Sequence, residues 1–340
     1  ISMSKTRVPL PKVPAGNLAF LTGLRDIAIG DTLVDVAATG AAPMAGLQYP
    51  TEPVVTYTVE PRSLKDLDSI QAPIAEFVAT DPALEFTVNP ETGEMLLSGA
   101  GELHVEIAVK KLARKGVHLV LGRPMVLLKE QMTHDGEPVT AGAENTSRFT
   151  VQALLTPENY IPPSDSAVLA SEAHSLNYLL DESASIDPLG EETEWLREAF
   201  KTLVRGGPVA GERMRRVTIV IQQAEIKSEG PETSWRDITQ PLLEAARRSV
   251  MTGDPVLLEP WTRLEITVPE EYVGEVTSIL SRRKGKVLTI DTERALFRIE
   301  AEIPVRESFG LANELRTATS GWATWGAQPG EYRPAGESGV

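Results

Sequence analysis

The residue best suited to contact a nucleic acid is Trp235, in a polar loop between a strand-like and a helix-like segment. An exposed indole can stack on a nucleobase. A loop tryptophan can equally fold back onto its domain as an anchor, and the sequence leaves both interpretations open. Lys227 and Arg236 are the nearest cations, but the loop, residues 225–237, holds more acidic than basic side chains. On charge alone it is a weak phosphate ligand.

A second candidate is the basic run of Arg282, Arg283 and Lys284 at the end of a predicted helix. Cations are favoured at a helix C-terminus by the helix dipole. The same side chains could bind phosphate. The sequence does not separate these two roles.

A third candidate is the run of small residues from Ser98 to Gly101, followed by Glu102, at a predicted strand-to-helix junction. Free N–H groups at a helix start can bind an anion. The pattern alone favours a tight turn over a phosphate loop.

No catalytic set of side chains is recognisable in the sequence. The chain has no cysteine, its four histidines lack metal-ligand spacing, and it contains no GxxxxGK[ST] phosphate loop. The acidic run 187–194 is interpreted as a solvated helix start. We therefore predict no catalytic, cofactor-binding or metal-ligating residue in this chain.

The composition is that of an ordinary folded protein, with 41% hydrophobic residues among 340. The net charge of −15 comes from 33 Lys and Arg against 48 Asp and Glu. A stand-alone nucleic-acid binder usually has a basic footprint, so any RNA contact here would depend on local patches. We recognise neither a membrane-spanning apolar run nor a signal peptide, so a cytoplasmic location without membrane contact is expected.

Two segments of about eighty residues share the β-α-β-β-α-β order of ferredoxin-like units. Alternating apolar residues predict the strands, and apolar residues three or four apart predict the helices. In the first unit we expect strands at 53–60, 84–88, 95–97 and 118–121, and helices at 64–77 and 103–112. In the second we expect strands at 264–268, 286–291, 295–303 and 322–326, and helices at 270–283 and 308–318.

The remaining segments are less regular. Residues 123–258 mix strands, expected at 149–155 and 217–225, with two helices. One carries Trp195, Ala199 and Leu203 on one stripe and ends at residues 206–208 (GGP), and the other starts at Pro241. The first 48 residues have β-rich runs at Val8, Val13 and 18–21, which predict part of a β-barrel with too few strands to close. A linker is expected at 37–50. The fold class predicted from these patterns is α+β with several domains.

Several motifs together resemble the translation elongation factor 2 family. Residues 97–104 read LSGAGELH, like that family's LSGxGELH signature, and residues 51–55 (TEPVV) resemble the start of its domain III. The runs at 282–285 (RRKG) and 307–310 (ESFG) resemble its domain V. The resemblance covers residues 5–335 and is closest in style to archaeal members.

The resemblance implies a domain order. Residues 1–48 would be the end of the β-barrel domain II, 49–122 the ferredoxin-like domain III, 123–258 a domain IV similar to ribosomal protein S5, and 259–340 the ferredoxin-like domain V. The family's GTP-binding domain, which would hold GTP and magnesium, precedes domain II and is not in this sequence. We therefore expect the C-terminal portion of a longer GTPase, without a cofactor of its own.

The sequence departs from the family at the tip of domain IV. Family members carry there a loop such as HEDNIHRGPAQ, whose second histidine is modified to diphthamide. Aligned residues 227–237 have Glu232 in place of that histidine and Thr233 in place of the next arginine. A carboxylate cannot carry the modification and reverses the charge beside RNA phosphates. This predicts a paralogue, or a lineage without diphthamide.

The resemblance implies two alternative functions. In the first, the parent GTPase binds the factor site of the ribosome and moves the tRNA–mRNA module. In the second, an altered tip makes the protein a ribosome-binding regulator, a hibernation, recycling or assembly factor that does not translocate. In either case we expect a monomer whose partners are ribosomal RNA, ribosomal proteins and tRNA–mRNA.

Both functions place contacts on three groups of residues, and neither makes this chain catalytic by itself. The tip contacts to tRNA or mRNA would be Lys227, Glu232, Thr233, Ser234, Trp235 and Arg236. The contacts of domain V to ribosomal RNA would be Arg282, Arg283 and Lys284. The relay that senses the GTPase domain would be Ser98, Gly99, Gly101 and Glu102.

Overall fold

The structure is a computed structural model in which the chain divides into two units, Ile1–Gln48 and Tyr49–Val340. It describes residues 2–3, 6–7, 10–23, 27, 29–37, 44, 53–62, 67–89, 93–143, 146–162, 168–187, 190–227, 234–293 and 296–336. The fold is mixed α+β, with several sheets. No helix among these residues is both long and apolar enough to span a bilayer.

The first unit has little regular structure among its described residues. Strands β1 (Ser2–Met3) and β2 (Thr6–Arg7) form one antiparallel pair, and no closed barrel is present in the part that is described. The strands predicted around Val13 and residues 18–21 are wrong, since no strand covers them. Leu18 and Phe20 are 97% and 81% exposed. A strand needs a neighbouring edge to pair with, and the described residues of this unit offer none there.

The first sheet of the second unit has the strand order β4-β5-β3-β6, all antiparallel. The apolar faces of helices α1 and α2 pack on it around Ile74, Leu97 and Leu112, which are fully buried. The element order β-α-β-β-α-β is as predicted. These elements are β3 (Val55–Pro61), α1 (Leu67–Val78), β4 (Glu85–Val88), β5 (Met95–Gly99), α2 (Glu102–Arg114) and β6 (Leu119–Val126).

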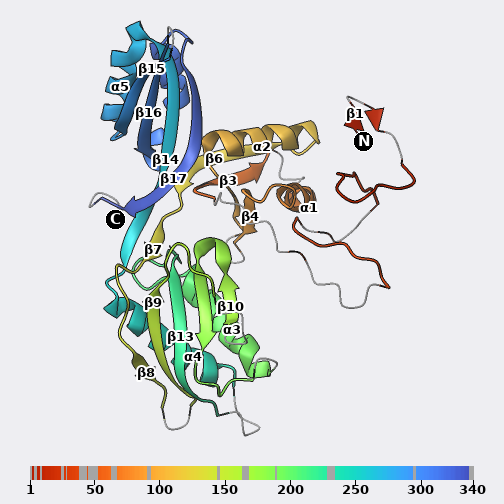
Figure 1. Ribbon diagram of the computed structural model, residues 1–340, viewed down its shortest axis with the longest axis vertical. Helices are drawn as coiled ribbons and strands as arrows, with labels where there is room; N and C mark the ends of the chain where they lie inside the picture. The colour runs from red at the N-terminus through yellow and green to blue at the C-terminus, as the bar shows by residue number, and fades with distance from the viewer. Residues whose placement is uncertain are drawn as a thin grey trace. The chain divides into compact units, whose positions relative to one another are not determined.

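The middle sheet has the order β10-β11-β13-β9-β8, and helices α3 and α4 cover one face (Figure 1). The alternation along β13 explains its burial, because Ile219 and Ile221 face the helices while Val220 packs with Tyr178 on the opposite face. These elements are β8 (Val139–Ala141), β9 (Arg148–Leu155), β10 (Val168–Glu172), the short 3-10 turn η2 (Ala173–Ser175), β11 (Asn177–Asp181), α3 (Glu191–Arg205), β13 (Val217–Glu225) and α4 (Arg236–Thr252).

The third sheet is built around the long strand β14, which pairs with β7 near its start and with β16 and β17 further on (Figure 1). Around β14 the strand order is β15-β16-β14-β17, which repeats that of the first sheet. Its elements are β7 (Lys129–Gln131), β12 (Arg213–Met214), β14 (Val256–Pro269), η3 (Glu270–Tyr272), α5 (Val273–Arg282), β15 (Lys286–Glu293), β16 (Leu296–Pro304), α6 (Val305–Ser308), α7 (Leu311–Ala318) and β17 (Thr324–Pro334).

Three sequence predictions within the second unit need correction. The helix expected to start at Pro241 starts at Arg236. The single helix expected at 308–318 is two helices, α6 and α7, separated at Gly310, whose φ of 73° lies in the left-handed region. The strand expected at 264–268 is the much longer β14, which begins at Val256 and continues past residue 258 without interruption.

Candidate functional site

The described part of the tip loop lies between the end of β13 and the start of α4. Ser147, from a loop distant in the sequence, binds both ends of the tip loop. Its Oγ accepts a hydrogen bond from Lys227 N (3.1 Å), and its own N–H donates to Asp237 O (3.0 Å). Ser147 is fully buried. Glu232 and Thr233 lie outside the described residues. Sequence reasoning missed Ser147, because nothing in its local pattern indicates a partner eighty residues away.

Trp235 lies at the start of α4 and is 54% exposed. The turn before the helix is closed by Ser234 N, which donates to Asp237 Oδ2 over 2.8 Å. The Arg236 guanidinium carbon lies 5.4 Å from the centre of the Trp235 ring, within cation–π range. The indole is therefore braced by its neighbour and still exposes about half of its surface to a stacking partner.

The basic run at the end of α5 is already engaged by other groups. Arg283 donates through Nε to Glu314 (2.6 Å) and through Nη1 to the carbonyls of Glu307 (2.6 Å) and Phe309 (2.8 Å). Its side chain is only 23% exposed, against 63% for Arg282 and 64% for Lys284. Arg283 therefore holds the loop before α7, and the exposed charges of this group are Arg282 and Lys284.

Arg282 and Lys284 also have acidic partners. Arg282 Nη2 is 3.1 Å from Glu314 Oε1, and Lys284 Nζ is 3.6 Å from Glu307 Oε1. In both pairs the cation is mostly exposed, whereas its carboxylate is only 33% exposed in Glu314 and 29% in Glu307. The solvent side of each cation therefore stays accessible to a phosphate while its carboxylate partner remains in place.

The loop from Ser98 to Gly101 is a packed turn. Ala100 N–H donates to His104 Nδ1 (3.1 Å), so the ring proton is assigned to Nε2, which donates to Asp81 Oδ2 (3.1 Å). A Cβ on Gly99 would lie 2.8 Å from the side chain of Val105. Ser98 Oγ and Thr56 Oγ1 are hydrogen-bonded at 2.7 Å within the sheet. His104 and Asp81 brace this turn, a role that the sequence analysis did not assign.

Glu102 begins α2 and connects the first sheet to the third. Its Oε2 accepts a hydrogen bond from Gly310 N over 3.0 Å. Its charge also acts on Tyr57: burial, and then the charges of Glu102 and Glu106, raise the pKa of the Tyr57 hydroxyl to about 12. The proposed relay and the basic run thus meet at one loop, because Arg283 holds Phe309 and Glu102 holds Gly310.

Two features bear on the expectation that this chain holds no cofactor. The sequence has no phosphate loop. Within the described ranges, no group of three or more His, Asp or Glu side chains is arranged to hold a metal ion. The absence of a cofactor stays a prediction.

Comparison with known proteins identifies the class of protein. Residues 51–123 match the family described as elongation factor G, domain III, and residues 256–339 match the elongation factor G C-terminus. These segments contain the first sheet and most of the third. The chain is thus a homologue of translation elongation factors.

The curated relatives are elongation factors 2 of several archaea. Elongation factor 2 of Aeropyrum pernix is 32% identical over 96% of this chain and 49% of its own length. Elongation factor 2 of Pyrobaculum arsenaticum is 30% identical over 99% of this chain and 50% of its own length. Elongation factor 2 of Methanosarcina barkeri is 29% identical over 98% of this chain and 49% of its own length. The chain is a relative of elongation factor 2, as its motifs indicate, and it spans about half the length of the curated relatives it matches.

Proposed function

We propose that this chain is the C-terminal portion of an elongation-factor-2-like translational GTPase that binds the factor site of the ribosome and promotes tRNA–mRNA translocation. The observation that carries the proposal is the similarity to elongation factor 2 along 96–99% of the chain. The domain assignment of the sequence analysis is part of this proposal: the end of domain II, domain III, an S5-like domain IV and domain V. GTP and magnesium would be held by a domain preceding domain II.

The geometry supports ferredoxin-like folds for domains III and V. In both, the strand order places the last strand beside the first and the two middle strands on the other side: β6-β3-β5-β4 and β17-β14-β16-β15. Helices cover one face in each case. This is the arrangement expected of the split β-α-β motif.

The tip and the basic run support RNA contact in this proposal. Trp235 is exposed and supported by Arg236, as a stacking platform requires. Arg282 and Lys284 present exposed cations on domain V. Such a factor would act in the cytoplasm as a monomer on the ribosome.

The second candidate is a ribosome-binding regulator that does not translocate. One sequence feature favours it, the carboxylate of Glu232 at the position where the family carries its modified histidine. A carboxylate is repelled by RNA phosphates, and this repulsion opposes the entry of the tip into the decoding site that translocation requires.

A toeprinting assay of one translocation step tests the proposal. It uses the full-length gene product, GTP and matched ribosomes. A shift of the toeprint by one codon supports translocation. Co-sedimentation with ribosomes without a shift supports the regulator, and absence of both contradicts the two candidates together.

A further inference from the structure

Arg215 is a half-buried cation to which the described residues supply no acidic partner. It follows β12, where its N–H donates to the carbonyl of Glu130 over 2.9 Å. Its guanidinium carbon lies 4.7 Å above the centre of the Tyr332 ring. The Nε atom is enclosed, and no described residue accepts a hydrogen bond from it. The described residues thus give this guanidinium no anionic partner, and its charge is available to an anion that enters from solvent.

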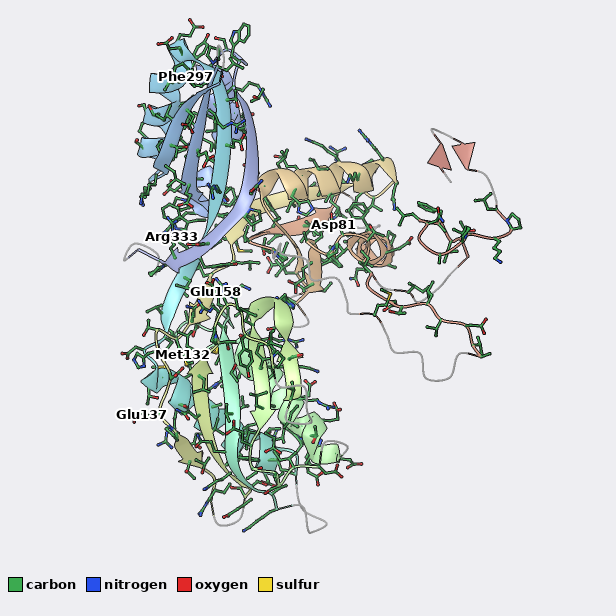
Figure 2. All side chains as sticks on the ribbon, in the orientation of Figure 1. Asp81, Met132, Glu137, Glu158, Phe297 and Arg333 are labelled. Atoms are coloured by element: carbon green, nitrogen blue, oxygen red, sulfur yellow. The ribbon has the colours of Figure 1, made fainter. Side chains whose placement is uncertain are left out.

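Arg215 lines a pocket of about 360 Å³ where the three sheets of the second unit meet. The first sheet contributes Val54, the residues before β13 contribute Arg215 and Arg216, and β17 contributes its segment from Pro329 to Tyr332. Figure 2 labels Glu158, which lines the pocket, and Arg333, which follows the lining residue Tyr332. A volume of this size is within the range of pockets that take small ligands.

The neighbouring Arg216 is held in a strained conformation, with φ of 53°. Three hydrogen bonds fix it: Arg216 N donates to Ser175 O (2.8 Å), Thr156 N donates to Arg216 O (3.0 Å), and Arg216 Nε donates to Thr156 O (2.8 Å). A non-glycine residue in the left-handed region persists only where its surroundings enforce it. The enforced turn directs two consecutive arginines toward one pocket.

The charged residues that line the pocket are two cations, Arg215 and Arg216, and two acids, Glu158 and Glu331, with the imidazole of His174 beside them. The two acids are exposed to solvent, whereas the two arginines are partly buried. Arg216 Nη1 is 3.5 Å from Glu158, and the Glu158 side chain is 78% exposed. Glu331 is exposed on β17. Lys129 Nζ also lies 5.7 Å from the centre of the Tyr332 ring, so two cations, Arg215 and Lys129, lie near this tyrosine.

We propose that this pocket binds a phosphate group, with Arg215 as its anchor. A phosphate offers three oxygens, which match donors from Arg215, Arg216 and His174, whereas a carboxylate offers two. The planar fork of an arginine is suited to two parallel hydrogen bonds to such oxygens. The phosphate can be free or can belong to an RNA backbone. The site goes beyond the proposed function and does not depend on translocation.

Binding of inorganic phosphate and of a single-stranded oligoribonucleotide to the full chain tests this site. Phosphate is titrated by calorimetry in chloride buffer, and the oligonucleotide by fluorescence anisotropy at several salt concentrations. Arg215→Met keeps a long apolar side chain against Tyr332 and removes the charge. We expect the affinity of the bound probe to fall by about tenfold or more, the effect of losing one charge-assisted contact.

Two further variants make the result specific. Arg205→Ala removes an equal charge from the exposed end of α3, outside the pocket, and should leave binding unchanged. Arg215→Lys keeps the charge without the fork and should weaken binding severalfold, which provides a test if the methionine variant folds poorly. Circular dichroism checks the fold of each variant.

The two probes separate the sources of the phosphate. Arg215-dependent binding of inorganic phosphate alone assigns the site to free phosphate. Arg215-dependent binding of the oligonucleotide, with a salt slope reduced by about one, assigns it to an RNA backbone. Binding of neither probe, or equal weakening by Arg205→Ala, overturns the proposal.

Discussion

The carboxylate of Glu130 is fully buried and organises the loop before β12. Its two oxygens accept hydrogen bonds from the backbone N–H groups of Val209 (2.9 Å), Ala210 (2.7 Å) and Glu212 (3.0 Å). A Cβ on Gly207 would lie 2.3 Å from this carboxylate, so only glycine fits there. The buried charge is thus stabilised by backbone dipoles, and it acts on the neighbouring carboxyl of Glu212.

Glu212→Gln should change the pH dependence of stability. Burial, and then the charge of Glu130, raise the pKa of the Glu212 carboxyl above its ordinary value of 4.5. The folded chain therefore binds this proton more tightly than the unfolded chain does, and the free energy of unfolding falls as the pH rises from 4.5 through the higher folded pKa. Glutamine removes this cost, so the variant should be more stable at neutral pH.

Urea unfolding across this pH range measures the Glu212 effect. Glu137→Gln is the matched control, because Glu137 is an exposed glutamate of the same unit, and it should leave the pH profile of stability unchanged. Figure 2 labels Glu137. If Glu212→Gln had the same stability as the parent chain at neutral pH, the Glu212 carboxylate would be as well solvated in the folded chain as in the unfolded chain, and the prediction would be wrong.

The proposed function predicts that Trp235→Ala weakens ribosome binding without unfolding the chain. The side chain is 54% exposed, so its removal should cost less than about 1 kcal/mol of stability. A stacked base is worth about 1–3 kcal/mol, so the affinity for ribosomes should fall roughly tenfold. Trp322→Ala is the control, because Trp322 is 64% exposed on the C-terminal body. If Trp235→Ala and Trp322→Ala bound ribosomes with equal affinity in co-sedimentation, Trp235 would not be a ribosome contact.

The elements follow local sequence patterns except where a distant residue supplies a missing partner. Helix α4 contains Pro241, which has no N–H for the carbonyl of Asp237. Ser147 N–H donates to that carbonyl instead, so the helix can start five residues earlier than the proline indicates. Similarly, Gly310 separates α6 from α7 because its backbone is in the left-handed conformation. Its N–H donates a hydrogen bond to the carboxylate of Glu102. Neither partner is visible in a local window of sequence.

Arg283 and Arg282 should differ sharply in their contribution to stability. Arg283 is only 23% exposed and makes hydrogen bonds to Glu314 and to the carbonyls of Glu307 and Phe309. Arg283→Ala leaves these acceptors unpaired and should cost about 2 kcal/mol after allowance for partial exposure. Arg282→Ala, at a 63% exposed side chain, should cost less than about 1 kcal/mol. Chemical denaturation measures both, and similar losses would contradict the structural role of Arg283.

Each of the three sheets of the second unit forms a body together with the helices that cover it. The arrangement of these three bodies could be predicted only in part. Periodicity predicts the repeated β-α-β-β-α-β order, because side-chain burial within each body follows its own sequence. It does not predict that Val305 of α6 is 2% exposed within the core of the first sheet, with Phe309 and Tyr332 packed beside it. The candidate site residues were likewise recognisable by type, whereas the acceptors that hold Arg283 come from a loop far along the chain.

The shared core predicts that the first and third bodies stabilise each other. Val305→Ala removes two methyl groups from a buried position and should cost about 2 kcal/mol. Because the lost contacts lie in the core of the first sheet, amide hydrogen exchange of β3 and β5 should accelerate in this variant. Val276→Ala is the matched control: Val276 is fully buried in the third body's own core and should accelerate exchange chiefly in α5 and β16. If exchange in β3 and β5 were unchanged by Val305→Ala, the two bodies would be independent, and a signal could not pass from Glu102 to the basic run through their contact.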